Sequence, residues 1–240
     1  MRRLLLAAFL VTVSTAALAQ DTRPDTRYDT ATVSGDVTGV SDYRHRGISR
    51  SDEGPALQGK LQLNSNIGLY GGLKGSTVDF GDADVEAVLF GGYKMDFDGV
   101  DVKTELNYST YPGDDGDDLD YAEFIASFGY DFDVFYGALT WGISPEYINE
   151  SGMSLYYGAD VAVPLEYGLT ATANLGFMFI DDEARYAEDY AHWGLGIWYN
   201  WAEWDVDLGL EYVDTNIDDD ECMDNCGATA VFTAKKPFGF

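Results

Sequence analysis

Apolar and polar residues alternate with a period of two along most of this chain, and this pattern limits the folds that it can adopt. The alternation is clear in residues 57–67, and it runs through residues 85–109 on both sides of the Asp98-Gly99 pair. A period of two is typical of a strand with one apolar and one polar face. Asp-Gly between two such runs indicates a tight hairpin. The sequence therefore predicts an all-β fold.

The length of the runs separates two kinds of β protein. The runs cover about 10–13 residues, which a tilted strand needs to cross a bilayer, whereas soluble strands have roughly five or six. With weaker candidates at 31–43, 69–78, 134–144 and 228–240, the runs number 12. Bacterial outer-membrane barrels have an even number of strands. We expect a transmembrane antiparallel β-barrel of about 12 strands, connected as an up-and-down meander, and not a β-sandwich.

The connections between the runs support a barrel. Short connections near 67, 98, 133, 166 and 202 alternate with mostly longer, polar ones. Short periplasmic turns and longer outside loops give this rhythm. Aromatic residues at the ends of the runs are expected to form the girdles of the membrane interfaces: Tyr108, Phe128, Tyr130, Phe132, Trp193 and Tyr212.

The N-terminal residues predict an exported protein. Arg2 and Arg3 precede the apolar run 4–13, and Ala17-Leu18-Ala19 has the small-x-small pattern of a signal-peptidase site. We expect a signal peptide at 1–19, a periplasmic segment at 20–30 and the barrel at 31–240. The expected location is the outer membrane of a Gram-negative bacterium. The expected partners are the lipid bilayer, lipopolysaccharide, the barrel assembly machinery and small solutes.

Composition excludes other classes of protein. The 240 residues include 14 Lys and Arg against 42 Asp and Glu, for a net charge of -28. Such a chain repels the phosphates of a nucleic acid. Hydrophobic residues make up 46%, too many for a disordered acidic chain.

One segment resembles a known family. Residues 41–51 read Ser-Asp-Tyr-Arg-His-Arg-Gly-Ile-Ser-Arg-Ser and are followed by the run 55–59. This segment is similar to the opening motif of the TorF family of proteobacterial proteins, and later pieces agree in order. The sequence departs from the family pattern at Lys74-Gly75 and at its end, 235–240. The resemblance implies an outer-membrane barrel thought to act as a pore, with no established solute.

Charged residues at inward positions indicate a wet lumen, because charges are costly in a dry one. The predicted pore-lining residues are Glu86, Asp96, Asp101, Lys103, Glu105, Asp205, Asp207 and Glu211. Acids outnumber bases, which favours cations. The sequence thus predicts a porin for passive diffusion of small solutes, with a weak cation preference. Trp198 and Phe90 also point inward, so the lumen could be open or plugged. A non-conducting structural or adhesin-type barrel is the alternative.

Three arginines, Arg44, Arg46 and Arg50, are placed at the outer mouth. They could form an anion-attracting ring, or a clamp that pairs with acidic loops and folds them over the lumen. They could equally contact lipopolysaccharide or be ordinary surface charge. We expect the arginines to be exposed and screened.

The long loops carry many acids, which we interpret as solvated surface. Cys222 and Cys226 lie in the last of these loops, beyond an export signal, where a disulfide is favoured over a metal pair. We expect no metal, no cofactor and no catalytic residue. His45 and His192 both lie near rims, but no nucleophile motif stands beside either, so an outer-membrane hydrolase is a weaker alternative.

Overall fold

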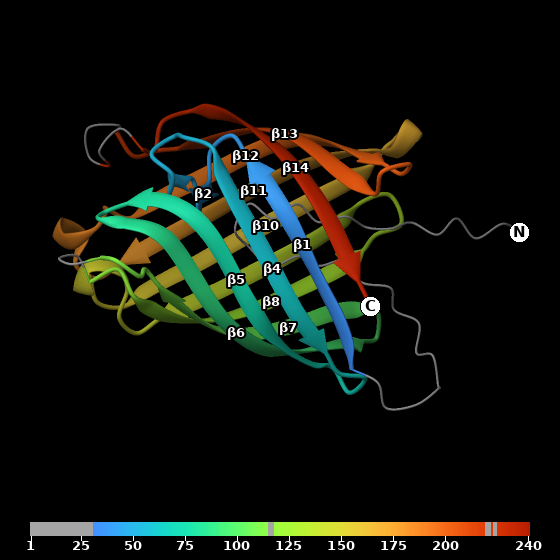
Figure 1. Cartoon of the computed structure of the whole chain (residues 1–240), viewed down its shortest axis with the longest axis horizontal. Helices are drawn as coiled ribbons and strands as arrows, with labels where there is room; N and C mark the ends of the chain where they lie inside the picture. Colours follow the sequence, from blue (N-terminus) through green and yellow to red (C-terminus); the bar gives the residue numbers. More distant parts are fainter. Residues whose placement is uncertain (1–30, 115–117, 219–221, 223–224) are drawn as a thin grey trace, which may run out of the picture.

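Twelve antiparallel strands form a closed barrel in the computed structural model, as the sequence predicted (Figure 1). The structure describes residues 31–114, 118–218, 222 and 225–240. The expected signal peptide and periplasmic segment lie outside these residues. The strands of the barrel are β1 (Thr32–Val40), β4 (Ala56–Asn64), β5 (Leu69–Phe80), β6 (Ala83–Phe97), β7 (Val100–Thr110), β8 (Tyr121–Asp131), β9 (Tyr136–Ser144), β10 (Ser154–Pro164), β11 (Leu169–Ile180), β12 (Tyr190–Trp201), β13 (Val206–Thr215) and β14 (Thr229–Gly239).

Each barrel strand pairs with its neighbours in the chain, and β14 closes the barrel against β1. Two further short strands, β2 (Arg44–His45) and β3 (Ile48–Ser49), pair only with each other. The segment just before them, residues 41–43, was predicted to belong to a strand at 31–43. That prediction was too long, because β1 ends at Val40 and the chain then turns.

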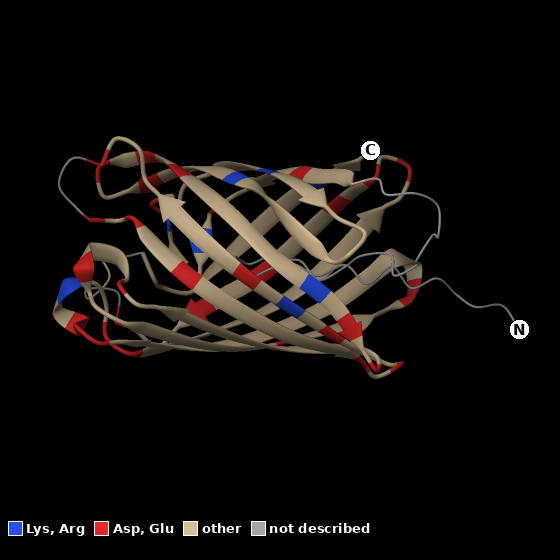
Figure 2. Cartoon of the chain, turned by 90° about the horizontal axis from the view of Figure 1, so that it is seen from below, with Lys and Arg blue, Asp and Glu red and all other residues tan. Residues whose placement is uncertain are grey.

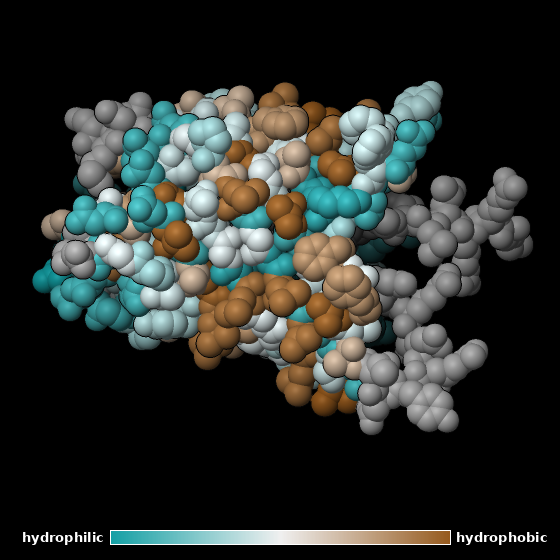
Figure 3. Space-filling view, in the orientation of Figure 1, coloured by the Kyte–Doolittle hydropathy of each residue, from teal (hydrophilic) through white to brown (hydrophobic). Residues whose placement is uncertain are grey.

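The outer face of the barrel is apolar. Alternate residues of the strands expose leucine, valine and aromatic side chains, among them Leu57, Leu61, Leu73, Leu89 and Leu139. Figure 3 shows these apolar side chains gathered over the middle of the barrel, whereas the end with the long loops is mostly hydrophilic. The apolar exterior allows contact with lipid tails. Closure of the barrel pairs the edge strands, so backbone N–H and C=O groups are hydrogen-bonded within the sheet and none faces lipid unpaired.

The two ends of the barrel differ. At one end, which we call the turn end, the connections are short, and the hairpin at Asp98 and Gly99 has the positive φ angles of 54° and 84° that such a tight turn requires. At the other end, the loop end, most connections are longer and include the 3-10 turns η1 (Ile148–Glu150) and η3 (Glu183–Arg185). The turn η2 (Glu166–Gly168) belongs to the turn end. No helix among the described residues is long and apolar enough to span a membrane.

Candidate functional site

The loop between β1 and β4, residues 41–55, folds into the loop end of the barrel. We call it the inner loop. Its hairpin, β2 and β3, turns at Arg46 and Gly47, which have φ angles of 52° and 87°. Arg44, Arg46 and Arg50 are 3%, 1% and 0% exposed. The expectation of exposed, screened arginines was therefore wrong, and surface contact with lipopolysaccharide does not fit side chains this deeply buried.

Arg46 reaches the far wall of the barrel. Its Nη2 lies 2.6 Å from Oε1 of Glu123 on β8, and both side chains are buried. The guanidinium stacks 3.9 Å from the ring centroid of Tyr156 on β10 and donates to the sulfur of Met178 on β11. A buried charge is stable only when it is paired and hydrogen-bonded. The contacts of Arg46 therefore hold the tip of the inner loop against three strands.

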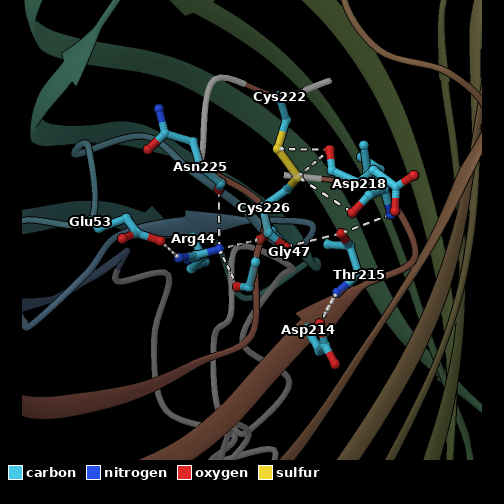
Figure 4. Close-up of a disulfide and its surroundings, with 11 residues drawn as sticks. Arg44, Gly47, Glu53, Asp214, Thr215, Asp218, Cys222, Asn225 and Cys226 are labelled. Carbon is cyan, nitrogen blue, oxygen red and sulfur yellow. Dashed lines mark hydrogen bonds and ion pairs between the residues drawn. A yellow bond between two sulfur atoms is a disulfide. The ribbon is translucent and has the colours of Figure 1, made fainter. Parts of the chain in front are cut away.

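Arg44 ties the inner loop to itself and to the last long loop (Figure 4). Its Nε lies 2.6 Å from Asp42 and its Nη2 lies 2.8 Å from Glu53. Its Nη1 donates to the backbone oxygens of Gly47, Asn225 and Gly227. One side chain thus donates to carbonyls of both loops where the inner loop meets the last loop.

Arg50 is linked to its carboxylate through a tyrosine. Its guanidinium lies 4.1 Å from the ring centroid of Phe80 and donates to Oη of Tyr111. That hydroxyl donates to Glu86 at 2.7 Å, and Tyr43 of the inner loop donates to the other oxygen of Glu86 at 2.8 Å. Burial, together with the charge of Glu86, raises the pKa of Tyr43, and burial raises the pKa of Tyr111, so both hydroxyls stay protonated donors.

The inner loop thereby contacts the wall on several sides, and an apolar cluster packs with it. This cluster includes Ile48, Tyr147, Ile148, Met178 and Cys226, all 5% exposed or less. The sequence suggested that the arginines form an anion-attracting ring or a clamp, and the geometry supports the clamp. Its acids, however, come from the barrel wall and from the inner loop itself, and not from the long acidic loops. The inner loop narrows the loop end of the lumen.

Below the inner loop, toward the turn end, the lumen wall is charged. Lys103 lies 2.9 Å from Glu105, which Lys74 also approaches at 3.5 Å. Glu211 accepts a hydrogen bond from Asn174, and Asp207 accepts one from Asn200. Figure 2 shows Lys or Arg and Asp or Glu residues on the barrel strands, between the loop end and the turn end. These side chains make the interior of the barrel polar, and Lys103, Glu105, Asp207 and Glu211 are each 8% exposed or less.

The other predicted pore-lining residues lie toward the two ends. Glu86 belongs to the contacts of the inner loop. Asp101 accepts from Tyr136, and Asp96 accepts from the backbone of Gly99 in its hairpin. Asp205 is a correction: it lies in the turn between β12 and β13, its side chain is 67% exposed, and it approaches Lys236. The period-two pattern of β13 extends one residue beyond the start of the strand, to Asp205, and this is why the sequence placed Asp205 on the lumen wall.

Several charged lumen residues were missed, among them Lys74 and Asp160. Lys74 was noted only as a departure from a family motif, and Asp160 was not singled out. Asp160 lies opposite Asn174 in the register of β10 and β11 and shares its face with Tyr156. The alternation in 154–164 contained this signal, because Asp160 is the one charged residue at an inward position of that run.

Large inward side chains lie flat on the wall. Tyr70 covers Gly92 of the next strand, Phe90 covers Gly72, and Trp198 covers Gly209, since a Cβ at any of these glycines would overlap the neighbouring ring. A ring that lies across a glycine does not project toward the axis. The inward Phe90 and Trp198 are 3% and 8% exposed, so other lumen side chains cover them, and the ammonium groups of Lys60 and Lys74 lie over the ring of Phe90.

Cys222 and Cys226 form a disulfide with their Cα atoms 6.0 Å apart. Figure 4 shows the disulfide beside Thr215 and close to Arg44, and the hydroxyl of Thr215 donates to the backbone oxygen of Cys226. The bridge fixes the segment whose carbonyls Arg44 binds. It stabilises the last loop where that loop meets the inner loop.

His45 lies within the inner loop and His192 lies on β12 beside Gly47 of that loop, so neither histidine is at an open rim. Nε2 of His192 is 3.2 Å from Oη of Tyr156, and the two rings stack. Among the described residues, neither histidine is hydrogen-bonded to a carboxylate, and no three His, Cys, Asp or Glu side chains are grouped to hold a metal ion. The expected absence of catalytic residues remains a prediction.

Comparison with known proteins identifies the family. Residues 25–238 match the family described as "Bacterial protein of unknown function (Gcw_chp)". The chain belongs to this family. A search of curated proteins found no match. The TorF name is therefore not confirmed, although the Gcw_chp chain has the porin-like fold that the resemblance implied.

Solved structures of porins share the fold of this Gcw_chp chain. A structure titled "KdgM porin" matches with a TM-score of 0.60 and 7% identity, covering 86% of this chain and 99% of that one. A structure of the NanC porin matches with a TM-score of 0.55 and 9% identity, covering 86% and 98%. The fold is thus that of outer-membrane porins. With its apolar exterior, the barrel belongs in the outer membrane, as the sequence predicted.

The disulfide of the Gcw_chp chain can be tested on intact cells. The sequence places the last loop outside the cell, so the thiols should be accessible once reduced. We expect a membrane-impermeant maleimide to label the protein only after treatment with a reductant, and Cys222→Ser with Cys226→Ser to remove the labelling. Labelling of the wild type before reduction would contradict the bridge.

The packing of the inner loop should weaken in acid. Burial, with the charges of Arg46 and Arg50, holds the pKa of His45 well below its ordinary value. A displaced loop would take up a proton near pH 6.5 while the packed loop would not, so the packed state loses stability as pH falls below about 6.5. We expect faster hydrogen exchange of residues 44–50 at pH 5.5 than at pH 7.5, after correction for the intrinsic rates. His45→Gln should reduce this difference, and an equal difference in the variant would contradict the role of His45.

Proposed function

We propose that this chain is an outer-membrane pore through which small solutes diffuse passively, that it prefers cations weakly, and that it has no enzymatic activity. The observation that carries the proposal is a lumen wall lined with charged side chains inside an apolar exterior. Charged side chains such as Lys103, Asp160 and Glu211 are costly in a dry interior, which favours a lumen that holds water. The resemblance to the TorF family and the porin fold both support the proposal.

The proposed cation preference follows from the inward charges below the inner loop. Carboxylates exceed ammonium groups there, and carboxylate-lined pores favour cations. We expect the arginines of the inner loop not to reverse this preference, because Arg44 and Arg46 are paired with carboxylates and Arg50 is linked to Glu86 through the hydroxyl of Tyr111. The lysines of the wall are Lys60, Lys74, Lys94, Lys103 and Lys235, and the acids are Asp36, Asp96, Asp101, Glu105, Asp160, Asp207 and Glu211.

Planar-bilayer recordings test the proposal. We expect discrete openings of low conductance, because the inner loop narrows one end, and a reversal potential across a KCl gradient that shows weak cation preference. Asp207→Asn with Glu211→Gln should move the reversal potential toward anions. Asp205→Asn with Asp182→Asn removes two exposed carboxylates and should leave it unchanged. Anion preference of the wild type, or equal shifts in the two double variants, would contradict the cation preference.

The second candidate function is a non-conducting structural or adhesin-type barrel. The packed loop end favours it, since the inner loop and its apolar cluster occupy that end of the lumen. Complete absence of openings for the wild type, with a barrel that still migrates as folded on an unboiled gel, would support this function and contradict the pore. The proposed partners remain the bilayer, lipopolysaccharide, the barrel assembly machinery and, for a pore, small solutes.

A further inference from the structure

The lumen charges below the inner loop are separated by sign. On one wall, the ammonium groups of Lys60 and Lys74 lie 5.3 and 4.9 Å from the ring centroid of Phe90. Lys103 lies 5.3 Å from the ring of Tyr70 and pairs with Glu105. Lys74 and Lys103 share Glu105, and Lys60 lies opposite Asp36 in the register of β1 and β4, where Asp36 also pairs with Lys235. The group of Lys60, Lys74, Lys103 and Glu105 on β4–β7, which we call the lysine wall, carries a net positive charge.

Two carboxylates form the acid wall, Asp160 on β10 and Glu211 on β13. They interact electrostatically with each other, and the amide of Asn174 on β11 donates to Glu211 at 2.7 Å. Among the described residues, no lysine, arginine or histidine lies within 4.0 Å of either carboxylate. The acid wall therefore carries a net negative charge.

The strand order places the two walls on opposite sides of the barrel. Going round the closed sheet, β8 and β9 separate them on one side, and β1 and β14 separate them on the other. A solute that passes along the axis therefore has the lysine wall on one side and the acid wall on the other.

The register places the two walls at one depth. Glu86 and Tyr156 both contact the inner loop, through Tyr43 and Arg46. Phe90, which the lysines approach, is two inward positions from Glu86 on β6, and Asp160 is two inward positions from Tyr156 on β10, in both cases toward the turn end. Positive and negative groups therefore face each other across the lumen directly below its narrow part.

We propose that this part of the lumen selects small zwitterions, solutes that carry a carboxylate and an ammonium group. A field across the lumen orients a dipolar solute, with its carboxylate toward the lysine wall and its ammonium group toward the acid wall. Both charged groups are then stabilised at the depth where the solute loses water. A solute with one charge gains from one wall only, and a neutral solute gains from neither. This inference rests on the proposed pore.

Four probes of similar size test the inference by their effect on single-channel current: the zwitterion glycylglycine, the anion N-acetylglycine, the cation glycylglycinamide and the neutral N-acetylglycinamide. We expect glycylglycine to reduce the current at a several-fold lower concentration than the other three. Lys60→Gln with Lys74→Gln, and separately Asp160→Asn with Glu211→Gln, should each remove most of this advantage. Asp133→Asn, in a turn at the turn end, is the matched control and should retain it.

The outcomes separate the inference from the proposed function. Openings that all four probes reduce alike, or an advantage of glycylglycine that survives both double variants, would overturn the zwitterion selectivity and leave the pore intact. Absence of openings in the wild type would overturn the pore, and the selectivity with it. Unboiled migration on a gel checks that each variant has folded, so a loss of the advantage cannot come from a lost barrel.

Discussion

Arg46→Ala is expected to raise the single-channel conductance strongly, because it releases the tip of the inner loop. The substitution removes a 2.6 Å ion pair and leaves Glu123, 3% exposed, as a buried charge without its cation. Breaking one side of a buried pair costs about 3–5 kcal/mol, and about 1.4 kcal/mol is a tenfold change in an equilibrium constant. The equilibrium between packed and displaced inner loop should therefore shift by at least about a hundredfold toward the displaced state.

Arg185→Ala is the matched control for this experiment. Arg185 also pairs with two carboxylates, Glu150 at 3.0 Å and Asp182 at 3.4 Å, but its side chain is half exposed. Exposed pairs contribute about 0–1 kcal/mol, so the conductance should not change. Hydrogen exchange of residues 44–50 should accelerate in Arg46→Ala alone. Unchanged conductance together with unchanged exchange would show that Arg46 does not hold the inner loop in the lumen.

The barrel could be predicted from the sequence because the bilayer imposes a local rule. Every lipid-facing position must be apolar, so Leu57, Leu61 and Leu63 mark an outer face without knowledge of any distant contact. The end of β1 could not be predicted in this way. Asp42 accepts hydrogen bonds from Arg44 and Ser49, and this local network turns the chain inward where the alternation alone would continue the strand.

The clamp was predicted only as one of several roles for the arginines, for a physical reason. Arg46 and Glu123 are 77 residues apart in the chain, and their pairing depends on the register of the four intervening barrel strands, β4 to β7. Charged residues are almost never fully buried unless they are paired, so exposure is the reasonable expectation for an arginine whose partner is unknown. The separation of the lumen charges into two walls could not be predicted for the same reason, because it depends on the order of the strands around the closed barrel.

Gly47→Val is expected to displace the inner loop even though it removes no charge. Gly47 has a φ of 87°, which a β-branched residue adopts only with strain. A Cβ at this position would lie 2.5 Å from Cγ2 of Thr215 and 2.8 Å from Cβ of His192, both on barrel strands. The hairpin of β2 and β3 therefore cannot rest against β12 and β13 with a larger residue at its tip. We expect conductance at least as high as in Arg46→Ala.

Gly113→Val is the control for Gly47→Val. It separates the effect of a side chain that overlaps its neighbours from the effect of backbone strain at a positive φ. Gly113 lies in another loop at the loop end with a φ of 99°, but a Cβ there would meet nothing within 4 Å. Strain at a positive φ alone costs about 1–3 kcal/mol and would act on a loop that holds none of the three arginines. The conductance of Gly113→Val should therefore equal that of the wild type. If the two valine variants raised the conductance alike, general loosening of the loops, and not the seating of the inner loop against the wall, would control the opening.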